Sequence, residues 1–384
     1  AVPILKAALA VAALGAIGCG DDSLLSLGPE PGADPFTTAE SYDPEIDGPV
    51  VARLRLPAPG EGDFLLRATI PVPPGTVLGG GTRVPFAVLS SSDPTASITQ
   101  VETVTRYADE TGGADVVELI ARVRRPDVAP GTPIEYRVIH SPLEPDTQFE
   151  LAPAVDTLVG APGTLRLVAN DPFGHRYEMD LLRGLRERDP AQQTVREGEL
   201  VHEVAEVGAL TPVTPVAGPQ GTLPRMMGVT AYVRTFARED FLALDLHLHN
   251  AYDNQDASVE WDAAIADLYF RSLKLRLPTG WQVLHPFNSP YSAAGQPAGN
   301  MQEAALVSPL GGGRMHMMPQ QSQFTRRLII ARPEAVGRAR AELEHEGFAF
   351  CIDGTTPQGD RLWSWWNPAT ARYLPQNARL PDLS

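Results

Sequence analysis

Apolar and polar residues alternate over short stretches that begin near residue 50. The runs 51–56 (VARLRL) and 64–70 (FLLRATI) show this period of two, with Pro and Gly between them. Such a period places alternate side chains on opposite faces of a strand, and Pro and Gly favour the turns that join strands. Similar runs follow at 84–89, 97–106, 115–124 and 134–139. Segment 49–142 is therefore predicted to form a small antiparallel barrel or sandwich.

The second half of the chain has longer alternating runs. They lie at 164–169, 194–207, 227–236, 241–250, 264–277 and 324–331. Strands of this length, separated by turn residues, predict a larger antiparallel β-sandwich in segment 143–384. One short helix is predicted from Pro333 to Glu346, because Pro suits a first helical turn and Gly347 suits a helix end. The predicted fold class is all-β, with this one helix.

The N-terminus carries an apolar run with the character of an export signal. Residues 7–18 (AALAVAALGAIG) follow Lys6 and precede Cys19. The run is too short to cross a bilayer and is typical of the apolar core of a signal peptide. Residues 16–19 (AIGC) resemble the lipobox of bacterial lipoproteins, in which the Cys is lipidated. We therefore expect a lipoprotein-type signal peptide at 1–19, a flexible tether at 20–48, export, and anchoring to a membrane of the cell envelope through Cys19. An ordinary secretory signal or a plain N-terminal helix is the alternative.

Charge and cysteine content narrow the classes of partner and of covalent chemistry. The chain of 384 residues has 31 basic and 47 acidic side chains, a formal net charge of −16. A nucleic-acid partner is not expected, because binding to phosphates needs a basic face. If Cys19 is acylated, Cys351 is the one remaining thiol, so no intramolecular disulfide can form. Cys351 lies in an apolar run, where a buried, unreactive Cys is expected.

Several short motifs follow one another in the order found in a known family. They are 70–75 (IPVPPG), Gln100 with Glu102, 105–107 (TRY) and 113–119 (GADVVEL). In this order they resemble the N-terminal barrel of exo-rhamnogalacturonan lyase-like proteins. That family continues into a central β-sandwich, to which 232–250 (YVRTFAREDFLALDLHLHN) is similar, and then into a helical toroid. The resemblance implies a polysaccharide partner and a further domain beyond Ser384.

One strand carries a candidate metal site. In 244–250 (LDLHLHN) the alternation places the leucines on one face and Asp245, His247 and His249 on the other. Two imidazoles and a carboxylate can bind Zn²⁺ if a neighbouring strand supplies a further ligand. The alternative is a polar surface of hydrogen-bonded side chains. The next turn carries Asn250, Asp253, Asn254 and Asp256, which are possible Ca²⁺ ligands but also ordinary turn residues. We therefore expect no cofactor, with Zn²⁺ or Ca²⁺ as open alternatives.

Candidate carbohydrate contacts lie near the C-terminus. Sugars pack their C–H faces on aromatic rings and bind planar polar groups through their hydroxyls. In an extended segment, Trp363 and Trp365 share one face, and Arg326 and Arg327 can form a patch for the carboxylates of uronic acids. The alternatives are tryptophans packed in a core and arginines that balance surface charge.

Three functions remain open on the sequence. The leading hypothesis is an exported surface lipoprotein that forms the non-catalytic β-region of a polysaccharide-acting protein and contacts carbohydrate. The first alternative is a rhamnogalacturonan-type polysaccharide lyase that a missing helical domain completes, and the second is a purely structural cell-surface protein. No set of catalytic residues can be named, because no spacing marks an acid–base group as a unit.

Overall fold

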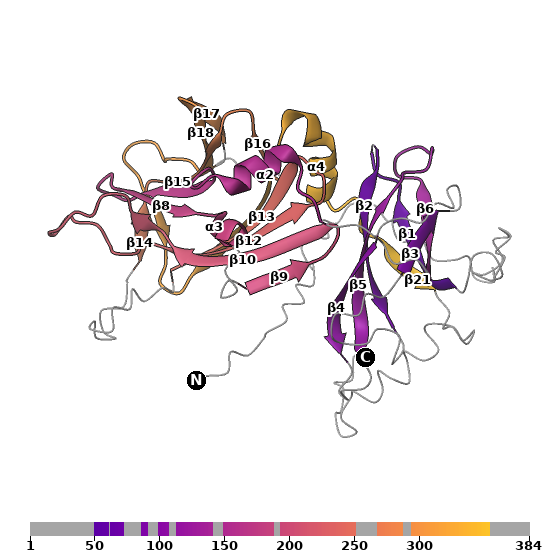
Figure 1. The fold of residues 1–384 in the computed structure, drawn as a ribbon. Coiled ribbons are helices and arrows are strands. Elements are labelled where there is room, and N and C mark those ends of the chain that lie inside the picture. Colours follow the sequence, from indigo (N-terminus) through magenta and orange to yellow (C-terminus); the bar gives the residue numbers. More distant parts are fainter. Residues whose placement is uncertain are drawn as a thin grey trace, which may run out of the picture. The chain divides into compact units, whose positions relative to one another are not determined.

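The computed structural model describes residues 50–60, 62–72, 86–90, 99–106, 113–140, 149–187, 193–250, 267–286 and 293–353. The chain divides into two compact units, 1–43 and 44–384, and all of the described residues belong to the second. These residues form antiparallel sheets with a few short helices (Figure 1), which confirms the all-β fold class. No helix in this part of the chain is long and apolar enough to span a bilayer.

Two sheets form a first sandwich. One has the strand order β21-β1-β6-β3 and the other β2-β5-β4. Their bounds are β1 (Val50–Pro57), β2 (Phe64–Pro71), β3 (Phe86–Ser90), β4 (Thr99–Arg106), β5 (Ala114–Val123), β6 (Pro133–His140) and β21 (Phe350–Asp353). Alternate residues of facing strands, such as Leu54 and Leu66, are fully buried in one apolar cluster. The described strands close no barrel, so the sandwich is the predicted architecture that is present.

Two six-stranded sheets form a second, larger sandwich. The first, here called the β13 sheet, has the order β16-β20-β13-β12-β10-β9, and the second, the β15 sheet, has the order β11-β8-β7-β15-β18-β17. The bounds in the β13 sheet are β9 (Gln193–Glu197), β10 (Val201–Ala209), β12 (Gly228–Phe236), β13 (Phe241–His249), β16 (Gln282–Leu284) and β20 (Gln323–Ala331). Those in the β15 sheet are β7 (Arg166–Asn170), β8 (Arg176–Asp180), β11 (Thr211–Pro212), β15 (Ser272–Pro278), β17 (Ala293–Ala298) and β18 (Met301–Val307). A separate ribbon pairs β14 (Leu268–Phe270) with β19 (His316–Met318).

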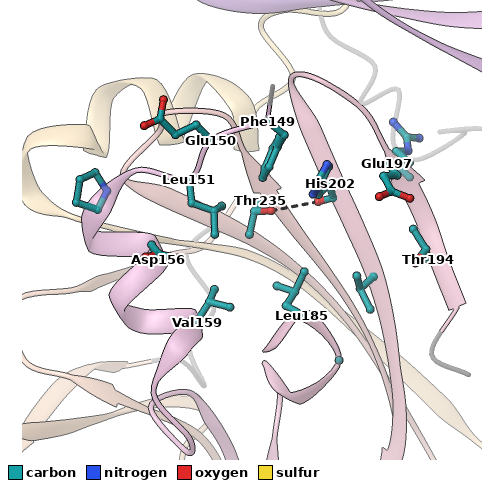
Figure 2. A pocket seen from close by; sticks show the side chains of 14 residues that line it. Phe149, Glu150, Leu151, Asp156, Val159, Leu185, Thr194, Glu197, His202 and Thr235 are labelled. Atoms are coloured by element: carbon teal, nitrogen blue, oxygen red, sulfur yellow. Dashed lines mark hydrogen bonds between the residues drawn. The ribbon is translucent and has the colours of Figure 1, made fainter. Parts of the chain in front are cut away.

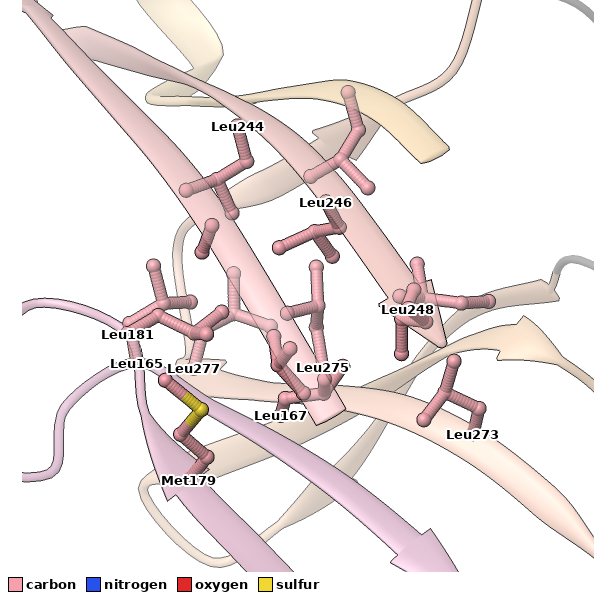
Figure 3. Packing of buried hydrophobic residues seen from close by; sticks show 14 of the residues in the cluster. Leu165, Leu167, Met179, Leu181, Leu244, Leu246, Leu248, Leu273, Leu275 and Leu277 are labelled. Carbon is pink, nitrogen blue, oxygen red and sulfur yellow. The ribbon is translucent and has the colours of Figure 1, made fainter. Parts of the chain in front are cut away.

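Leucines hold the two large sheets together. Leu244, Leu246 and Leu248 of β13 lie in the same buried cluster as Leu273 and Leu275 of β15 (Figure 3). Each is inaccessible to solvent, and their spacing of two residues matches the period of a strand with one buried face. Burial of a leucine contributes about 1.5–3 kcal/mol, so this alternation is the main local determinant of the sandwich.

Short helices pack against the second sandwich. They are α2 (Pro153–Gly160), α3 (Arg183–Glu187), the 3₁₀ turn η3 (Pro333–Ala335) and α4 (Val336–Leu343). The helix predicted at Pro333 is present as η3 followed by α4, with Pro333 in the first turn. Buried side chains of α2 join the core of the leucines, whereas Ala339 and Leu343 of α4 pack on a different cluster that includes Phe241 and Ile329 of the β13 sheet.

The structure divides two of the predicted long strands. Run 194–207 is a hairpin of β9 and β10, and run 264–277 contains β14 and β15, with Arg271 between them. In both places a period of two continues across a reversal or a break, so periodicity alone does not locate the interruption. The predicted domain limits stay a prediction, and the last described strand, β21, pairs with β1 at the other end of the described chain.

Candidate ligand-binding cleft

A cleft lies beside strand β10, near the edge of the β13 sheet. The register pairs His202 with Thr235 and Val204 with Val233, so these side chains share one sheet face. Val233 is buried in the core of the sandwich, which shows that this is the inward face. Among the described strands, only the short β9 lies beyond β10 in this sheet, and helices α2 and α3 line the cleft on the other side (Figure 2).

The cleft has a volume of about 730 Å³, within the range of known small-molecule sites. Its lining residues lie in the segment before α2, in helices α2 and α3, and in strands β9, β10 and β12. The lining residues are Phe149, Glu150, Leu151, Pro153, Asp156, Val159, Gly184, Leu185, Thr194, Arg196, Glu197, His202, Val204 and Thr235. Segments far apart in sequence therefore meet around one space.

An aromatic pair forms one wall of this cleft. The rings of Phe149 and His202 are stacked, with centroids 3.6 Å apart and planes inclined by 12°. The Thr235 hydroxyl donates to the carbonyl oxygen of His202 at 3.5 Å. Both rings are partly exposed, so the pair presents an apolar flat surface beside polar groups.

Carboxylates and a hydroxyl surround the aromatic wall. Glu197 and Thr194 extend from β9, while Glu150 and Asp156 lie on the side of α2 (Figure 2). Glu150 accepts a hydrogen bond from Nε of Arg238 at 3.2 Å, in a largely exposed ion pair. The cleft thus combines a flat apolar face with hydrogen-bonding groups on two sides, an arrangement suited to a neutral polyhydroxylated ligand.

An ion pair between the buried Glu206 and the partly exposed Arg183 ties α3 to β10. Nη2 of Arg183 donates to Oε1 of Glu206 at 2.6 Å, and the Glu206 side chain is 1% exposed. Burial raises the pKa of Glu206 above its usual value, although the positive charge of Arg183 opposes that effect. The pair fixes α3 against the strand, so it positions Gly184 and Leu185 in the cleft lining.

The predicted metal ligands Asp245, His247 and His249 lie on one face of β13, as the alternation requires, but each of them contacts other groups of the protein. Asp245 accepts a hydrogen bond from Nε of Arg327 at 2.8 Å, and the His247 ring packs edge-on against Tyr232 at 5.4 Å. The His249 ring packs over Gly228, where an added Cβ would lie 2.1 Å from the ring. Within the described residues no group of three or more His, Cys, Asp and Glu side chains is placed to hold a metal ion. Zinc binding by Asp245, His247 and His249 stays a prediction.

Arg326 and Arg327 do not form one patch. They are consecutive on β20 and therefore point to opposite faces of the sheet. The guanidinium of Arg326 lies 5.1 Å from the ring centroid of Phe324, while Arg327 pairs with Asp245 on the other face. One ligand carboxylate cannot be held by both groups in this arrangement.

The remaining predicted site residues lie outside the described residues. These are Trp363 and Trp365, the lipidation site Cys19, and the turn residues Asp253, Asn254 and Asp256. Cys351 is described: it lies half-buried in β21, where it packs against the core of the first sandwich.

The cleft could not be predicted from the sequence. Phe149 precedes α2 without a recognisable motif, and His202 belongs to a run of regular alternation. A signal was present in that run, 201–206 (VHEVAE), because His202 and Glu206 occupy positions that face the sandwich core. Polar residues on the inward face of a strand often mark the border of a cavity or a functional site. Their significance depends on knowing which face is inward.

The comparisons with known proteins found only a weak structural likeness. No family model matches the sequence, and no curated protein matches it. Two solved structures from Enterococcus faecalis are similar to this chain, one described as a protein in glycosyl hydrolase family 38 and the other as an alpha-mannosidase. The identities are 10% and 9%, with TM-scores of 0.33 and 0.31. The likeness covers 76% of this chain but 46% and 45% of those proteins, so the chain spans about half their length. A likeness of this size carries no argument about activity.

The predicted resemblance to exo-rhamnogalacturonan lyase-like proteins is wrong. No family model matches, and the solved structures named above are described as a protein in glycosyl hydrolase family 38 and as an alpha-mannosidase, not as lyases of that type. The motifs that carried the resemblance have ordinary structural explanations where they are described. Gln100 bonds to the backbone of β10, and 113–119 begins strand β5. Short motifs of strand and turn residues recur in unrelated β-proteins.

Proposed function

We propose that this chain is a non-catalytic, carbohydrate-contacting β-region of a polysaccharide-acting protein, and that the cleft beside β10 binds the sugar. The observation that carries the proposal is the stacked pair of Phe149 and His202 in the wall of a cleft of about 730 Å³. Polar groups at Glu197 and Thr194 lie next to that pair.

The chemistry of the lining favours a sugar over a wholly apolar ligand. A pyranose ring has an apolar C–H face that packs on an aromatic ring, and hydroxyl groups at its edge that donate to carboxylates. Leu151, Val159 and Leu185 supply further apolar surface between the two polar sides. Carboxylates without a nearby surplus of cations select against an anionic ligand in this cleft.

Binding of neutral oligosaccharides to the whole chain tests the proposal, with isothermal calorimetry on a panel of hexose and pentose oligomers. We expect Phe149→Ala to weaken binding by about tenfold, because it removes the stacking surface. Glu197→Gln is expected to weaken binding less, since an amide oxygen still accepts a hydrogen bond. Tyr269→Ala is the matched control: this aromatic side chain is exposed on β14 and does not line the cleft.

The outcomes separate the possible roles. Equal loss of binding in Phe149→Ala and Tyr269→Ala would place the sugar site elsewhere. Release of shorter sugars by the unmodified chain would contradict a non-catalytic role. If the panel gives no heat of binding at all, the purely structural role becomes the better account.

Export and lipid anchoring through Cys19 belong to the same proposal, on the evidence of the sequence. The apolar run 7–18 ahead of Cys19 supports it. The test is expression in a bacterium fed with labelled fatty acid, followed by membrane fractionation. We expect label and membrane recovery with the natural sequence, and neither with Cys19→Ser. Label that persists in Cys19→Ser would overturn the assignment of this residue.

A further inference from the structure

The outward face of the β15 sheet carries a compact group of cationic side chains. Strand alternation places Lys274 and Arg276 on the face opposite to the leucines of β15. The register sets Arg166 beside Arg276, and Arg176 lies on the next strand, β8. Lys274 and Arg276 are two residues apart on one face, which separates them by about 7 Å along the strand. The four side chains are called the cationic face below.

Two carboxylates hold these cations in place. Glu178 pairs with Arg166, with Nε of Arg176 at 2.7 Å, and more distantly with Arg276 at 3.9 Å. Glu303 pairs with Nη1 of Arg176 at 2.8 Å and with Nζ of Lys274 at 3.0 Å. Burial raises the pKa values of Glu178 and Glu303, but hydrogen bonds from the neighbouring cations outweigh it, so both pKa values lie below the usual range. Both groups are therefore charged at neutral pH.

Positive charge is in excess on this face. Four cations surround two carboxylates, which leaves a local charge of +2 on a chain whose formal charge is −16. The adjacent pair of Asp180 and Arg186 adds one charge of each sign and does not alter that difference. The cationic face is therefore a local region of positive potential on a protein whose net charge is negative.

The side chains of the cationic face are accessible to solvent and lie flat on the sheet. The side chains of Arg166, Arg176, Lys274 and Arg276 are 39%, 33%, 28% and 35% exposed. Val168 lies on the same outward face, yet it is fully buried, so the charged side chains lie across it. Each arginine has five N–H donors in a fixed plane, and the ion pairs with Glu178 and Glu303 occupy only some of them.

We propose that the cationic face binds the acidic groups of a polysaccharide that also carries neutral sugar units, so that the neutral units enter the cleft and the acidic groups lie along the outward face of the β15 sheet. The proposal rests on the carbohydrate function proposed above and assigns a second contact surface to it. Planar guanidinium groups bind carboxylates and sulfates through paired hydrogen bonds. The carboxylates of Glu178 and Glu303 fix the arginines before binding, which lowers the entropic cost of ordering them.

A polysaccharide fits this face better than a nucleic acid does. A duplex presents dense phosphate charge over a long surface, and the overall charge of −16 repels it outside the small cationic face. A polysaccharide with one acidic group per sugar or per few sugars needs few cations at spacings of several ångströms. The face offers such a set on a flat surface.

The experiment measures binding of the whole chain to alginate, which carries carboxylates, to dextran sulfate, and to neutral dextran, at 20 mM and 200 mM salt. We expect binding to the anionic polymers that weakens as salt rises, since surface charge contacts are screened. Comparison of alginate with dextran sulfate identifies which acidic group is preferred. A short DNA duplex serves as the fourth probe.

Variants of opposite sign locate the binding. The double variant Arg166→Gln with Arg276→Gln removes two charges and is expected to weaken alginate binding by at least about tenfold at low salt. Glu303→Gln removes a negative charge from the same face but keeps an oxygen that can accept from Arg176 and Lys274, so it is expected to tighten binding. The control pairs Arg314→Gln with Arg340→Gln, which removes the same net charge from exposed positions elsewhere. Urea unfolding of every variant confirms that each is folded.

The outcomes distinguish this inference from the proposed function. Equal weakening by the control pair, or tighter binding of the duplex than of alginate, would overturn the cationic face as a glycan site. Binding of neutral oligosaccharides in the cleft without binding of alginate would overturn the face and leave the proposed function standing. Absence of binding to every glycan would contradict both.

Discussion

The ring of Phe149 lies 3.6 Å from the ring of His202, in nearly parallel planes. Phe149 precedes helix α2, and His202 is the second residue of β10, so the stack joins the approach to the helix to an edge region of the sheet. The backbone continues this link, because Leu151 forms an isolated bridge with Ala237 beyond the end of β12. The aromatic wall of the cleft is therefore also a structural contact.

Loss of this stack is expected to lower stability as well as sugar binding. His202→Ala should reduce the free energy of unfolding by about 1 kcal/mol, the usual contribution of an aromatic pair beyond its buried area. His202→Phe preserves the stack and should stay within about 0.5 kcal/mol of the natural chain. Urea unfolding followed by tryptophan fluorescence measures both. A His202→Ala variant as stable as the natural chain would show that the stack contributes nothing to folding.

A buried glutamine, Gln100, forms hydrogen bonds with the backbone at the start of β10. Oε1 of Gln100 accepts from the backbone N–H groups of Leu200 and Val201 at 2.9 and 2.8 Å, and Nε2 donates to the carbonyl of Val201 at 3.1 Å. Gln100→Ala leaves these buried groups without a partner, so we expect a loss of about 2 kcal/mol or more in the free energy of unfolding. Thr103→Ala, at an exposed position of the same strand, is the control and should have little effect. Equal effects of the two variants would rule out the hydrogen bonds as the cause.

Gly347 is required by a close approach of two backbones. Its carbonyl accepts from the N–H of Arg67 at 2.8 Å, and a Cβ added at Gly347 would lie 1.9 Å from the carbonyl oxygen of Leu65. Gly347→Ala must displace one of these segments, and we expect it to destabilise the fold by about 2 kcal/mol. Gly311→Ala meets no atom within 4 Å and should be neutral, so thermal unfolding of the two variants provides a matched comparison. A neutral Gly347→Ala would be inconsistent with the close approach.

Protonation of His249 should oppose folding. Burial lowers the pKa of His249, and its Nδ1 is buried without a hydrogen-bond partner among the described residues. Below the unfolded pKa of about 6.5, the unfolded chain binds a proton that the folded chain binds less readily. The contribution of neutral His249 to the free energy of unfolding is therefore complete above a pH of about 6.5, and it is lost as the pH falls toward the pKa of His249 in the folded chain.

A comparison of variants isolates this effect from other titrating groups. Between pH 7.5 and pH 5.5, the urea midpoint of the natural chain should fall more than that of His249→Gln. Thr103→Ala, at an exposed position of β4 and without a titrating side chain, is the control and should follow the natural chain. If the fall is the same in all three proteins, His249 does not contribute to acid sensitivity.

The all-β fold was predictable because its determinants are local. Alternation in 241–249 gives Leu244, Leu246 and Leu248 one buried face, and the structure confirms that face. Pro333 and Gly347 likewise bracket η3, α4 and the turn that follows, because Pro suits a first helical turn. In each case the physical cause acts within a few residues, so the sequence contains it.

The candidate sites were not predictable to the same degree. Arg326 and Arg327 are neighbours in sequence, but their side chains lie on opposite faces of the β13 sheet, whereas Phe149 and His202 are distant in sequence and stacked. The cationic face likewise takes its cations from β7, β8 and β15 and its carboxylates from β8 and β18, so no single strand contains the whole group.

The sequence by itself determined where strands form and which of their faces is apolar, since the period of side chains along a strand is a local property. The tertiary structure alone decided that β21 pairs with β1, that α2 and α3 border the inward face of β10, and that Arg166 lies beside Arg276. These relations depend on strand order and register, which are set by the packing of the whole core. The alternation along a strand shows which of its faces is apolar, but it does not identify the distant strand with which it pairs.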